Sequence, residues 1–553
     1  MSNAKKSFWK SRTFFVLLSL IAAPPLLFVL LVVWVVIPVL LPNPPLVISE
    51  ETTRVTGPLT NKGYIDFFKA LEERYYPPEL TTDENGFRIF VRQFGDGGYS
   101  HDVTPEDREF YRRQVYEKLE LNLDVPPTMT LLLPPGEIVE DFDYGQPWTL
   151  EDYPMLADWV NEMDEPLDAL AEMIRKPVFY PPLLQSPESV KSGKPQLLVS
   201  IILPDGLLFR NIGRVFAARA AYRIGQGNID GAIEDKLTVH RLGRLTTQRG
   251  FLTQYLVGIA IENMAVAIPI SANSEHSITQ EQIQRVFERF DALPQRGSFR
   301  ETLEWDRYTG LSAIQDVQIE GSSRRTLNWN IIYRRMNDMY DAILQPPPQT
   351  EYAAILTEID EASDLTPWKR LAWMMTPYSR EKAMTHMFIA LMIPAVDAIL
   401  EATRRTECAE NMQRLVLAIK LYQLDNRTLP DGNWAEQIAK YLGENPEQYF
   451  SCPSNPSVNG ETTYALVQYG DNVPEHYEAI LLVELKVPVP LDKAVITVDE
   501  VLALPKNYDY DWKSNPSPHS DGMNTARRSG AVVFLSMGVS ESELSHLLGR
   551  SEK

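Results

Sequence analysis

The chain lacks the short sequence patterns that mark most enzymes. Its 553 residues contain no His-Glu-x-x-His motif, no Gly-x-Ser-x-Gly nucleophile turn, no Walker loop and no dinucleotide fingerprint. The seven histidines are scattered along the sequence. We therefore predict a protein without catalytic residues. Glycosidases use two carboxylates that follow no local spacing rule, so a hydrolase with its site in residues 61–205 stays open as the alternative.

Cysteine is equally scarce. Cys408 and Cys452 are the only two cysteines, and they form no Cys-x-x-Cys pair and no Cys/His set of the kind that binds zinc. From this spacing we expect neither a metal ion nor another cofactor.

Basic residues are also in the minority. The chain has 53 Lys and Arg against 74 Asp and Glu, a formal net charge of −21. Binding to a nucleic acid needs concentrated Lys and Arg, so we predict no nucleic-acid partner. The content of 44% hydrophobic and 23% charged residues is typical of folded rather than disordered chains.

One long uncharged run is present near the N-terminus. Residues 14–41 carry no charged side chain, and about 20 apolar residues are enough to cross a bilayer as a helix. Lys5, Lys6 and Arg12 precede the run and Glu50 follows it, which favours a cytoplasmic N-terminus. The sequence predicts a cytoplasmic tail at 1–12, a signal anchor at 13–42 and a single-pass protein of the cell membrane with its bulk outside the cytoplasm. A cleaved signal peptide is the alternative.

Proline-rich stretches and periodicity divide the rest of the chain. We expect a linker at 43–60, a mixed proline-rich region at 61–205 and a helical domain at 206–375. The mixed region has a helix start at Thr104-Pro105 and a strand candidate at 197–203. In the helical domain, Gly225-Gln-Gly-Asn228 joins two helices rich in small residues, which resembles one tetratricopeptide-type hairpin. A 34-residue period is absent, so an ordinary helical hairpin remains the alternative.

The C-terminal third combines one long helix with short strands. Thr376-Pro377 offers an N-cap and a first-turn proline, and predicts a helix from there to about Asn426. Its apolar part, 384–396, is too short to cross a bilayer. Strands are predicted at 464–469, 480–485 and 531–536. The predicted fold class is α+β, with an N-terminal transmembrane helix, a mainly α-helical middle region and a C-terminal head in which a long helix packs on a small antiparallel sheet.

Several motifs follow one another in this C-terminal region. The apolar run Met387-Phe-Ile-Ala-Leu-Met-Ile-Pro-Ala-Val396 comes first, and Cys408, Cys452-Pro453-Ser454, His519-Ser-Asp-Gly-Met-Asn524 and Ser529-Gly530 follow. This order, over residues 387–536, resembles the planctomycete family of pilin-like proteins of unknown function. The resemblance implies a pilin-like α+β domain at 376–545 whose motif residues are Asn411, Pro453, His519, Gly522, Asn524 and Gly530. It also implies an envelope-exposed structural or binding module.

The chain departs from the family pattern in two places. Family members begin with a leader and a cleavage site before the apolar helix, whereas residues 378–386 stand here instead, which argues against processing and insertion into a pilus. The terminal motif of the family ends in Asp-Gly, whereas this chain has Ser529-Gly530. The loss of that carboxylate weakens a metal-binding or catalytic role for the motif.

The resemblance and the expected oxidising location together predict a disulfide between Cys408 and Cys452. Closing a loop of about 45 residues would contribute roughly 4 kcal/mol in the chain-entropy model. Two buried thiols are the alternative. A calcium ion near His519 and Asp521, with Asp509 and Asp511, is a further option, although histidine is a poor calcium ligand. The competing interpretation is a turn in which Gly522 and Gly530 adopt positive φ.

These observations predict a membrane-anchored, extracytoplasmic structural or interaction protein with a pilin-like head and no catalytic activity. Its expected partners are the membrane, through the N-terminal helix, and envelope or secretion proteins.

Overall fold

The structure is a computed structural model of the chain. It describes residues 44–95, 104–130, 145–201, 204–248, 250–271, 277–320, 327–344, 377–456, 460–469, 478–507, 522–536 and 539–549, together with isolated positions such as Asp143 and His519. The predicted anchor at 13–42 lies almost entirely outside this part of the chain. Asp509, Asp511 and Asp521 of the proposed calcium site also lie outside it.

The chain forms two compact units, each built from segments that are not consecutive. The first unit comprises residues 1–74, 188–201 and 303–394, and the second comprises residues 75–187, 202–302 and 395–553. The predicted domains divide the chain consecutively, and their boundaries stay a prediction.

The first unit is helical. Its elements are α3 (Phe67–Tyr75), α9 (Pro187–Ser192), the 3-10 helix η2 (Leu198–Ser200), α14 (Phe299–Glu320), α15 (Trp329–Leu344) and the first part of α18 (Pro377–Asn426). The segment expected to be a linker is bound to α15, because the side chain of Asn337 donates to the carbonyl of the buried Thr52. Helix η2 occupies the place of the strand predicted at 197–203, so that prediction was wrong.

The second unit contains most of the helices and the sheet. Its helices before α18 are η1 (Pro78–Thr81), α4 (Gly86–Phe94), α5 (Pro105–Lys118), α7 (Pro154–Glu162), α8 (Asp164–Ile174), α10 (Pro204–Gly225), α11 (Ile229–Thr246), α12 (Leu252–Ala267) and α13 (Gln280–Asp291). Helix α5 begins as predicted: Pro105 is its first residue, and the hydroxyl of Thr104 accepts the backbone N–H of Asp107 at 3.2 Å.

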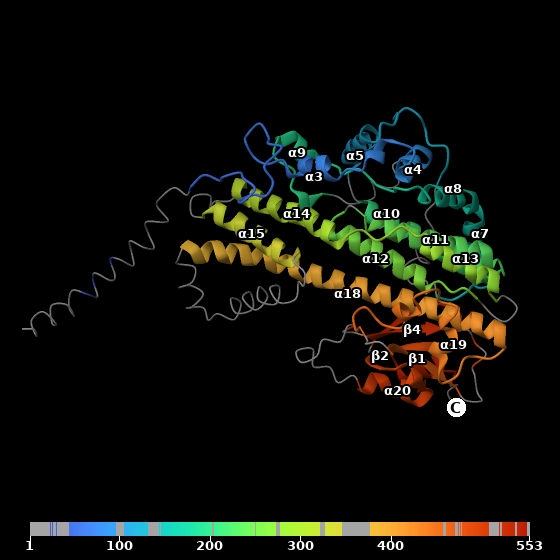
Figure 1. The fold of residues 1–553 in the computed structure, drawn as a ribbon. Helices are drawn as coiled ribbons and strands as arrows, with labels where there is room; N and C mark the ends of the chain where they lie inside the picture. Colours follow the sequence, from blue (N-terminus) through green and yellow to red (C-terminus); the bar gives the residue numbers. More distant parts are fainter. Residues whose placement is uncertain are drawn as a thin grey trace, which may run out of the picture. The chain divides into compact units, whose positions relative to one another are not determined.

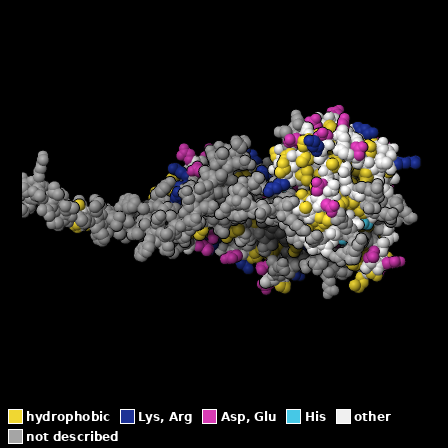
Figure 2. All heavy atoms as spheres, turned by 90° about the horizontal axis from the view of Figure 1, so that it is seen from below, with side chains coloured by type: hydrophobic (Ala, Val, Ile, Leu, Met, Phe, Trp, Pro, Cys, Tyr) yellow, Lys and Arg dark blue, Asp and Glu magenta, His cyan; other side chains and the backbone are white. Residues whose placement is uncertain are grey.

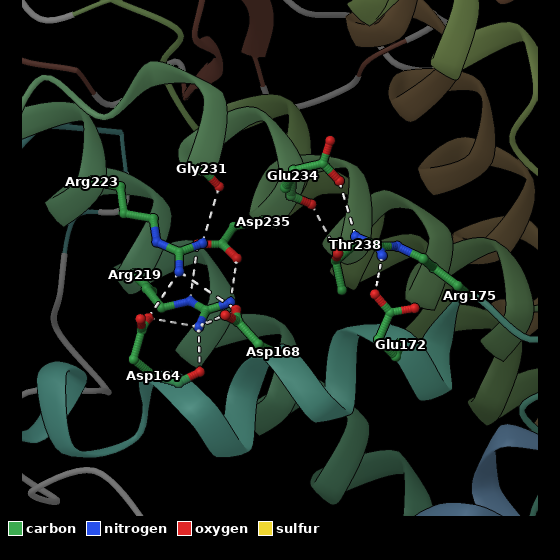
Figure 3. Close-up of polar contacts among 10 residues, drawn as sticks. All are labelled: Asp164, Asp168, Glu172, Arg175, Arg219, Arg223, Gly231, Glu234, Asp235 and Thr238. Carbon is green, nitrogen blue, oxygen red and sulfur yellow. Dashed lines mark hydrogen bonds and ion pairs between the residues drawn. The ribbon is translucent and has the colours of Figure 1, made fainter.

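Helices α10, α11 and α8 share a network of ion pairs (Figure 3). The guanidinium of Arg219 on α10 makes two hydrogen bonds to Asp235 on α11, at 2.7 and 3.1 Å, and both side chains are buried. On its other side, Arg219 contacts Asp164 and Asp168 of α8 at 3.0 and 2.9 Å. The predicted hairpin turn is present, since Asn228 caps α11 by accepting the backbone N–H of Gly231.

Helix α18 runs from Pro377 to Asn426, as predicted from the sequence. In the second unit it lies between the helices and the sheet (Figure 1). Toward the helices, Gln413 donates to the backbone carbonyl of Val266 on α12. Toward the sheet, Cys408, Met412 and Val416 are buried in one apolar cluster with Tyr464, Leu466 and Leu482. Their spacing of four residues places these three side chains on one face of the helix.

The sheet has five strands in the order β3-β1-β2-β4-β5. The strands are β1 (Glu461–Gln468), β2 (Ile480–Pro490), β3 (Val495–Thr497), β4 (Gly522–Arg527) and β5 (Val532–Ser536). Short helices surround them: α19 (Trp434–Ala439), η4 (Pro446–Tyr449), η5 (Leu491–Lys493), α20 (Val498–Asn507) and α21 (Glu541–Leu547). The pairs β1–β2, β2–β4 and β4–β5 are antiparallel, whereas β1–β3 is parallel.

The chain is therefore α+β, but two parts of the predicted fold class were wrong. The sheet is mixed rather than antiparallel, because β3 returns to the edge beside β1 in the parallel direction. The second correction concerns the predicted transmembrane helix, and it applies equally to the expected signal anchor. Among the described residues, no helix combines the length and the apolar character that a membrane crossing requires.

The surface mixes both signs of charge. On the face drawn in Figure 2, acidic and basic side chains of the described residues are interspersed among polar and apolar atoms. Such mixing of both signs is expected for a solvated surface.

Candidate metal centre

Four residues with metal-binding side chains meet inside the second unit. They are Cys408 on α18, Cys452 in the loop before β1, Glu484 on β2 and His519 shortly before β4. Each offers one ligand atom, and these four atoms all lie within 4.8 Å of one another. All four residues are buried, with at most 4% of their surface exposed. The cluster therefore connects α18, the loop before β1, the central strand β2 and the residues before β4.

The local structure fixes each of these side chains. Cys408 lies on the face of α18 that is turned to the sheet. The backbone N–H of Cys452 donates to the hydroxyl of Thr463 at 2.7 Å. Glu484 lies opposite Tyr464 in the β1–β2 register, and the phenol of Tyr464 is 3.1 Å from Sγ of Cys408.

The distances inside the cluster are short. Sγ of Cys408 donates to Oε1 of Glu484 at 3.0 Å. Nε2 of His519 is 3.2 Å from the same oxygen and 3.6 Å from Sγ of Cys452. Zinc bonds of about 2.0–2.3 Å in a tetrahedron imply ligand–ligand distances of about 3.3–3.8 Å. The measured distances lie close to this range.

A second layer of contacts orients two of the four ligands. Nδ1 of His519 is 2.8 Å from Oε1 of Glu401 on α18, so the ring directs Nε2 into the cluster. Oε2 of Glu484 accepts the backbone N–H and the side-chain amide of Asn524, both at 3.1 Å, which leaves Oε1 facing the sulfurs. A carboxylate on the far nitrogen of a histidine is the usual support of a metal ligand.

The charges in the cluster are strongly coupled. Burial alone would lower the pKa of His519, but hydrogen bonds with Cys452, Glu401 and Glu484 raise it to about 11. The hydrogen bond with Cys408 and then that with His519 lower the pKa of the Cys452 thiol against the effect of burial. Burial, followed by Cys452 and Glu484, raises the pKa of the Cys408 thiol. Without a metal, the ring of His519 is therefore an imidazolium, and it lies beside one thiol whose pKa is lowered, Cys452, and one whose pKa is raised, Cys408.

Two thiols, one imidazole and one carboxylate suit a particular class of ion. Thiolate and imidazole ligands select zinc and related transition metals, whereas calcium and magnesium require oxygen ligands. Metal ligation requires both cysteines as thiolates and His519 as the neutral imidazole, so binding of a divalent cation would release protons. The four residues present thus fit a Zn²⁺ ion in a closed, four-coordinate site.

Cys452, His519 and Glu401 also follow one another in the order of nucleophile, base and supporting carboxylate that activates a catalytic cysteine. Both Cys452 and His519 are buried, with 0% and 2% of their surface exposed. A nucleophile needs access to its substrate, and these side chains have almost none. The arrangement is therefore better suited to binding an ion than to covalent catalysis.

The two cysteines are free thiols in the structure. Their sulfurs lie within 4.8 Å of each other, so the pair is close without being bonded. The predicted disulfide stays a prediction.

The structure separates the motif residues of the C-terminal region. His519 and Asn524 belong to the cluster, and Asn411 borders it by donating to the carbonyl of Ser451 at 3.2 Å. Pro453 is exposed. Gly522 lies in β4 and does not have the positive φ expected of a turn, whereas Gly530 does, with φ of 84°.

Sequence reasoning missed Glu484, Glu401 and Tyr464. Glu484 directly follows the apolar run Ile480-Leu-Leu-Val in β2, and a carboxylate buried after such a run needs a partner. That contrast was the available signal. Glu401 gave none, because α18 carries many charged residues at similar positions.

In a second cluster of acidic and histidine side chains, the acids form ion pairs with two arginines. His240, Glu262 and Glu410 lie close together between α11, α12 and α18. Arg244 and Arg296 each bind both carboxylates, at 2.6 to 3.0 Å. Burial, with only partial compensation by Glu410, lowers the pKa of His240 to about 3, so the ring is neutral. Two guanidinium groups already balance the acids, and the cluster acts as an internal ion-pair network.

The carboxylates Asp164 and Asp168, in the region considered for a hydrolase, are likewise paired with Arg219 and Arg223. Their environment is that of a structural network.

Comparisons with family models, with curated proteins and with solved structures give no match for this chain. The resemblance to pilin-like proteins therefore stays a prediction from the motifs.

Proposed function

We propose that this chain is a non-catalytic structural or interaction protein whose C-terminal domain holds one Zn²⁺ ion between α18 and the sheet. The ligands are Cys408, Cys452, Glu484 and His519. One observation carries the proposal: four buried ligand atoms lie within 4.8 Å of one another, and the histidine among them is oriented by a carboxylate. Zinc sites with four protein ligands are structural, because no position is left for water or substrate.

The position of the cluster supports this role. Its ligands come from α18, from the loop before β1, from β2 and from the residues before β4, which are distant in the sequence. An ion bound at this point would join the helix to three parts of the sheet domain. The binding energy of a structural metal adds to the stability of the fold when the site is not preformed in the unfolded chain.

The predicted disulfide is the competing state of the same two cysteines. A disulfide would leave no thiolate to bind a metal, so the two states exclude each other. The presence of Glu484 and of the Glu401-supported His519 beside the sulfurs favours the metal, because a disulfide has no need of either side chain.

The test measures zinc and thiols in the full chain, purified without added metal, chelator or reductant. We expect about one zinc per chain by elemental mass spectrometry, and two free thiols after denaturation with a chelator. His519→Ala and Cys452→Ser should lose the zinc. His546→Ala is the matched control, because the His546 side chain is 73% exposed and lies outside the cluster.

Protein without metal and without free thiols would establish the disulfide instead. Metal-free protein with two free thiols would reject both states, and full zinc content in His519→Ala would place the ion elsewhere.

A further inference from the structure

The residues that lead into α7 form an exposed apolar patch. Six consecutive residues, 150–155, are all exposed to solvent. Three of them are large and apolar: Leu150 is 48% exposed, Tyr153 44% and Met155 70%. Single exposed apolar side chains are normal on a protein surface, but a group of them marks an interaction site. Tyr and Met are also enriched where proteins bind one another, and Met adapts to irregular surfaces.

The segment that carries this patch is fixed by contacts to the rest of the second unit. The indole N–H of Trp148 donates to the carbonyl of Ala218 on α10 at 3.0 Å, and its ring lies 4.6 Å from the ring of Tyr222. The carboxylate of Asp152 accepts both the backbone N–H and the hydroxyl of Thr149, each at 2.8 Å. The patch is therefore preorganised, which lowers the entropy that binding of a partner would cost.

The surroundings of the patch are acidic. Residues 145–174 contain eight Asp and Glu and no Lys, Arg or His. Asp152 binds Thr149, and three more of these acids are paired with arginines of the same unit. The other four are exposed, and their side chains have no ion-pair or hydrogen-bond partner among the described residues: Glu151, Asp158, Glu162 and Glu165. The unit itself thus leaves these four carboxylates unbalanced.

The apolar and the acidic side chains share one face of α7 (Pro154–Glu162). Met155, Asp158 and Glu162 follow one another at spacings of three and four residues, and side chains at these spacings are neighbours on a helix surface. All three are exposed. An apolar centre with a charged rim is the usual anatomy of a docking surface.

The charge of the rim and the size of the patch select the kind of partner. Carboxylates attract cationic partners and repel anionic ones such as nucleic acids and acidic membrane surfaces. A stable interface between two folded proteins takes roughly 20–30 residues from each side. The patch offers only residues 150–155 and the exposed face of α7, which suits one short segment of a partner.

We propose that residues 150–155 and the exposed acids of α7 bind a basic peptide segment of a partner protein, in which Lys or Arg alternate with apolar side chains. The apolar side chains of the segment would lie against Leu150, Tyr153 and Met155, and its cations against Asp158 and Glu162. The proposal extends the interaction role proposed above by naming the chemistry of a partner. It does not depend on zinc, because it shares no residue with the metal centre.

The experiment uses the full chain and a fluorescent peptide of roughly 14 residues, in which Lys and Leu are spaced as in an amphipathic helix. Binding is measured by fluorescence anisotropy at about 0.15 M salt. We expect a dissociation constant below about 100 μM. Two comparison peptides, one with Glu in place of Lys and one with Ser in place of Leu, should each bind at least about tenfold more weakly.

Two pairs of variants locate the site. Leu150→Ser and Met155→Ser remove apolar surface, and each should weaken peptide binding at least about fivefold. Val487→Ser is the matched control, because Val487 is 67% exposed in the same unit, and it should bind as the unaltered chain does. Asp158→Asn with Glu162→Gln should weaken binding about threefold or more and reduce its dependence on salt. Glu444→Gln, at another exposed acid of the unit, should change neither.

Three outcomes would overturn the proposal. The first is a peptide that does not bind at about 1 mM. The second is binding that persists unchanged in Leu150→Ser and in Met155→Ser, which would place the peptide elsewhere on an acidic protein. The third is self-association of the chain that Met155→Ser abolishes, since a second copy would then cover the patch. Zinc content, measured on the same samples, should be equal in all variants, so a failure here is distinguishable from a failure of the metal centre.

Discussion

Replacement of Asp235 by Ala tests whether the ion pairs of α8, α10 and α11 hold the second unit together. Arg219 is 1% exposed and contacts Asp235 with two hydrogen bonds, at 2.7 and 3.1 Å. In Asp235→Ala its acidic partners among the described residues would be Asp164 and Asp168, whose side chains are more than half exposed. Removing one partner of a buried ion pair costs about 3–5 kcal/mol. Since two acids remain on the other side of Arg219, we expect a loss of about 3 kcal/mol.

The double replacement Arg219→Met with Asp235→Leu separates the charge effect from packing. Two well-packed apolar side chains in place of a buried ion pair are often neutral or stabilising. The double variant should therefore be more stable than Asp235→Ala by about 2 kcal/mol or more. Asp230→Ala is the matched control, because its pair with Arg285 is largely exposed and should contribute no more than about 1 kcal/mol.

The assay is unfolding in guanidinium chloride, followed by circular dichroism, for the four proteins under the same conditions. If Asp235→Ala lost no more stability than Asp230→Ala, the buried pair would not support the unit as we describe. A double variant less stable than Asp235→Ala would show that Arg219 is held mainly by contacts other than the charge of Asp235.

Three further substitutions test other buried groups. Burial raises the pKa of Asp306 to about 7, although the hydrogen bond from Tyr340 acts in the opposite direction. The folded state therefore favours the protonated acid. Its contribution to the free energy of unfolding is fully present below about pH 4 and is lost as the pH rises through 7. Asp306→Asn, which cannot ionise, should therefore raise stability by up to about 4 kcal/mol at pH 8 and by little at pH 4 in thermal melts, and an equal gain at both values would refute this ionisation. A Cβ at Gly258 would lie 2.8 Å from the carbonyl oxygen of Gly243, where α11 and α12 meet, so Gly258→Ala should cost about 1–3 kcal/mol in denaturant unfolding, and no loss would contradict the close approach. His240 is buried with neither ring nitrogen hydrogen-bonded, so His240→Phe should leave stability unchanged or raise it by about 1 kcal/mol in the same assay, and a large loss would reveal a polar role.

Local signals predicted the helix boundaries well. Thr104-Pro105 and Thr376-Pro377 preceded helices that begin at Pro105 and Pro377. Both predictions rest on interactions within one turn of helix, which a short sequence window contains.

The order of the strands and the metal centre could not be predicted from short sequence windows. Strand β4 has the sequence Gly522-Met-Asn-Thr-Ala-Arg527, which lacks the alternation of apolar and polar residues by which strands are recognised. The segment 197–203 is apolar enough to predict a strand, but Leu198–Ser200 within it form the 3-10 helix η2. The four cluster residues lie at positions 408, 452, 484 and 519, and only the packing of α18 on the sheet brings them together.

The central claim, a zinc ion between α18 and the sheet, is tested most directly by X-ray absorption at the zinc edge on the purified full chain. The four ligands predict two sulfur atoms at about 2.3 Å and two nitrogen or oxygen atoms at about 2.0–2.1 Å around each zinc. In Cys408→Ser, one sulfur should be lost from this shell or the zinc should be absent. A zinc shell made only of nitrogen and oxygen, or protein that binds no zinc when supplied with it in reduced form, would contradict the account.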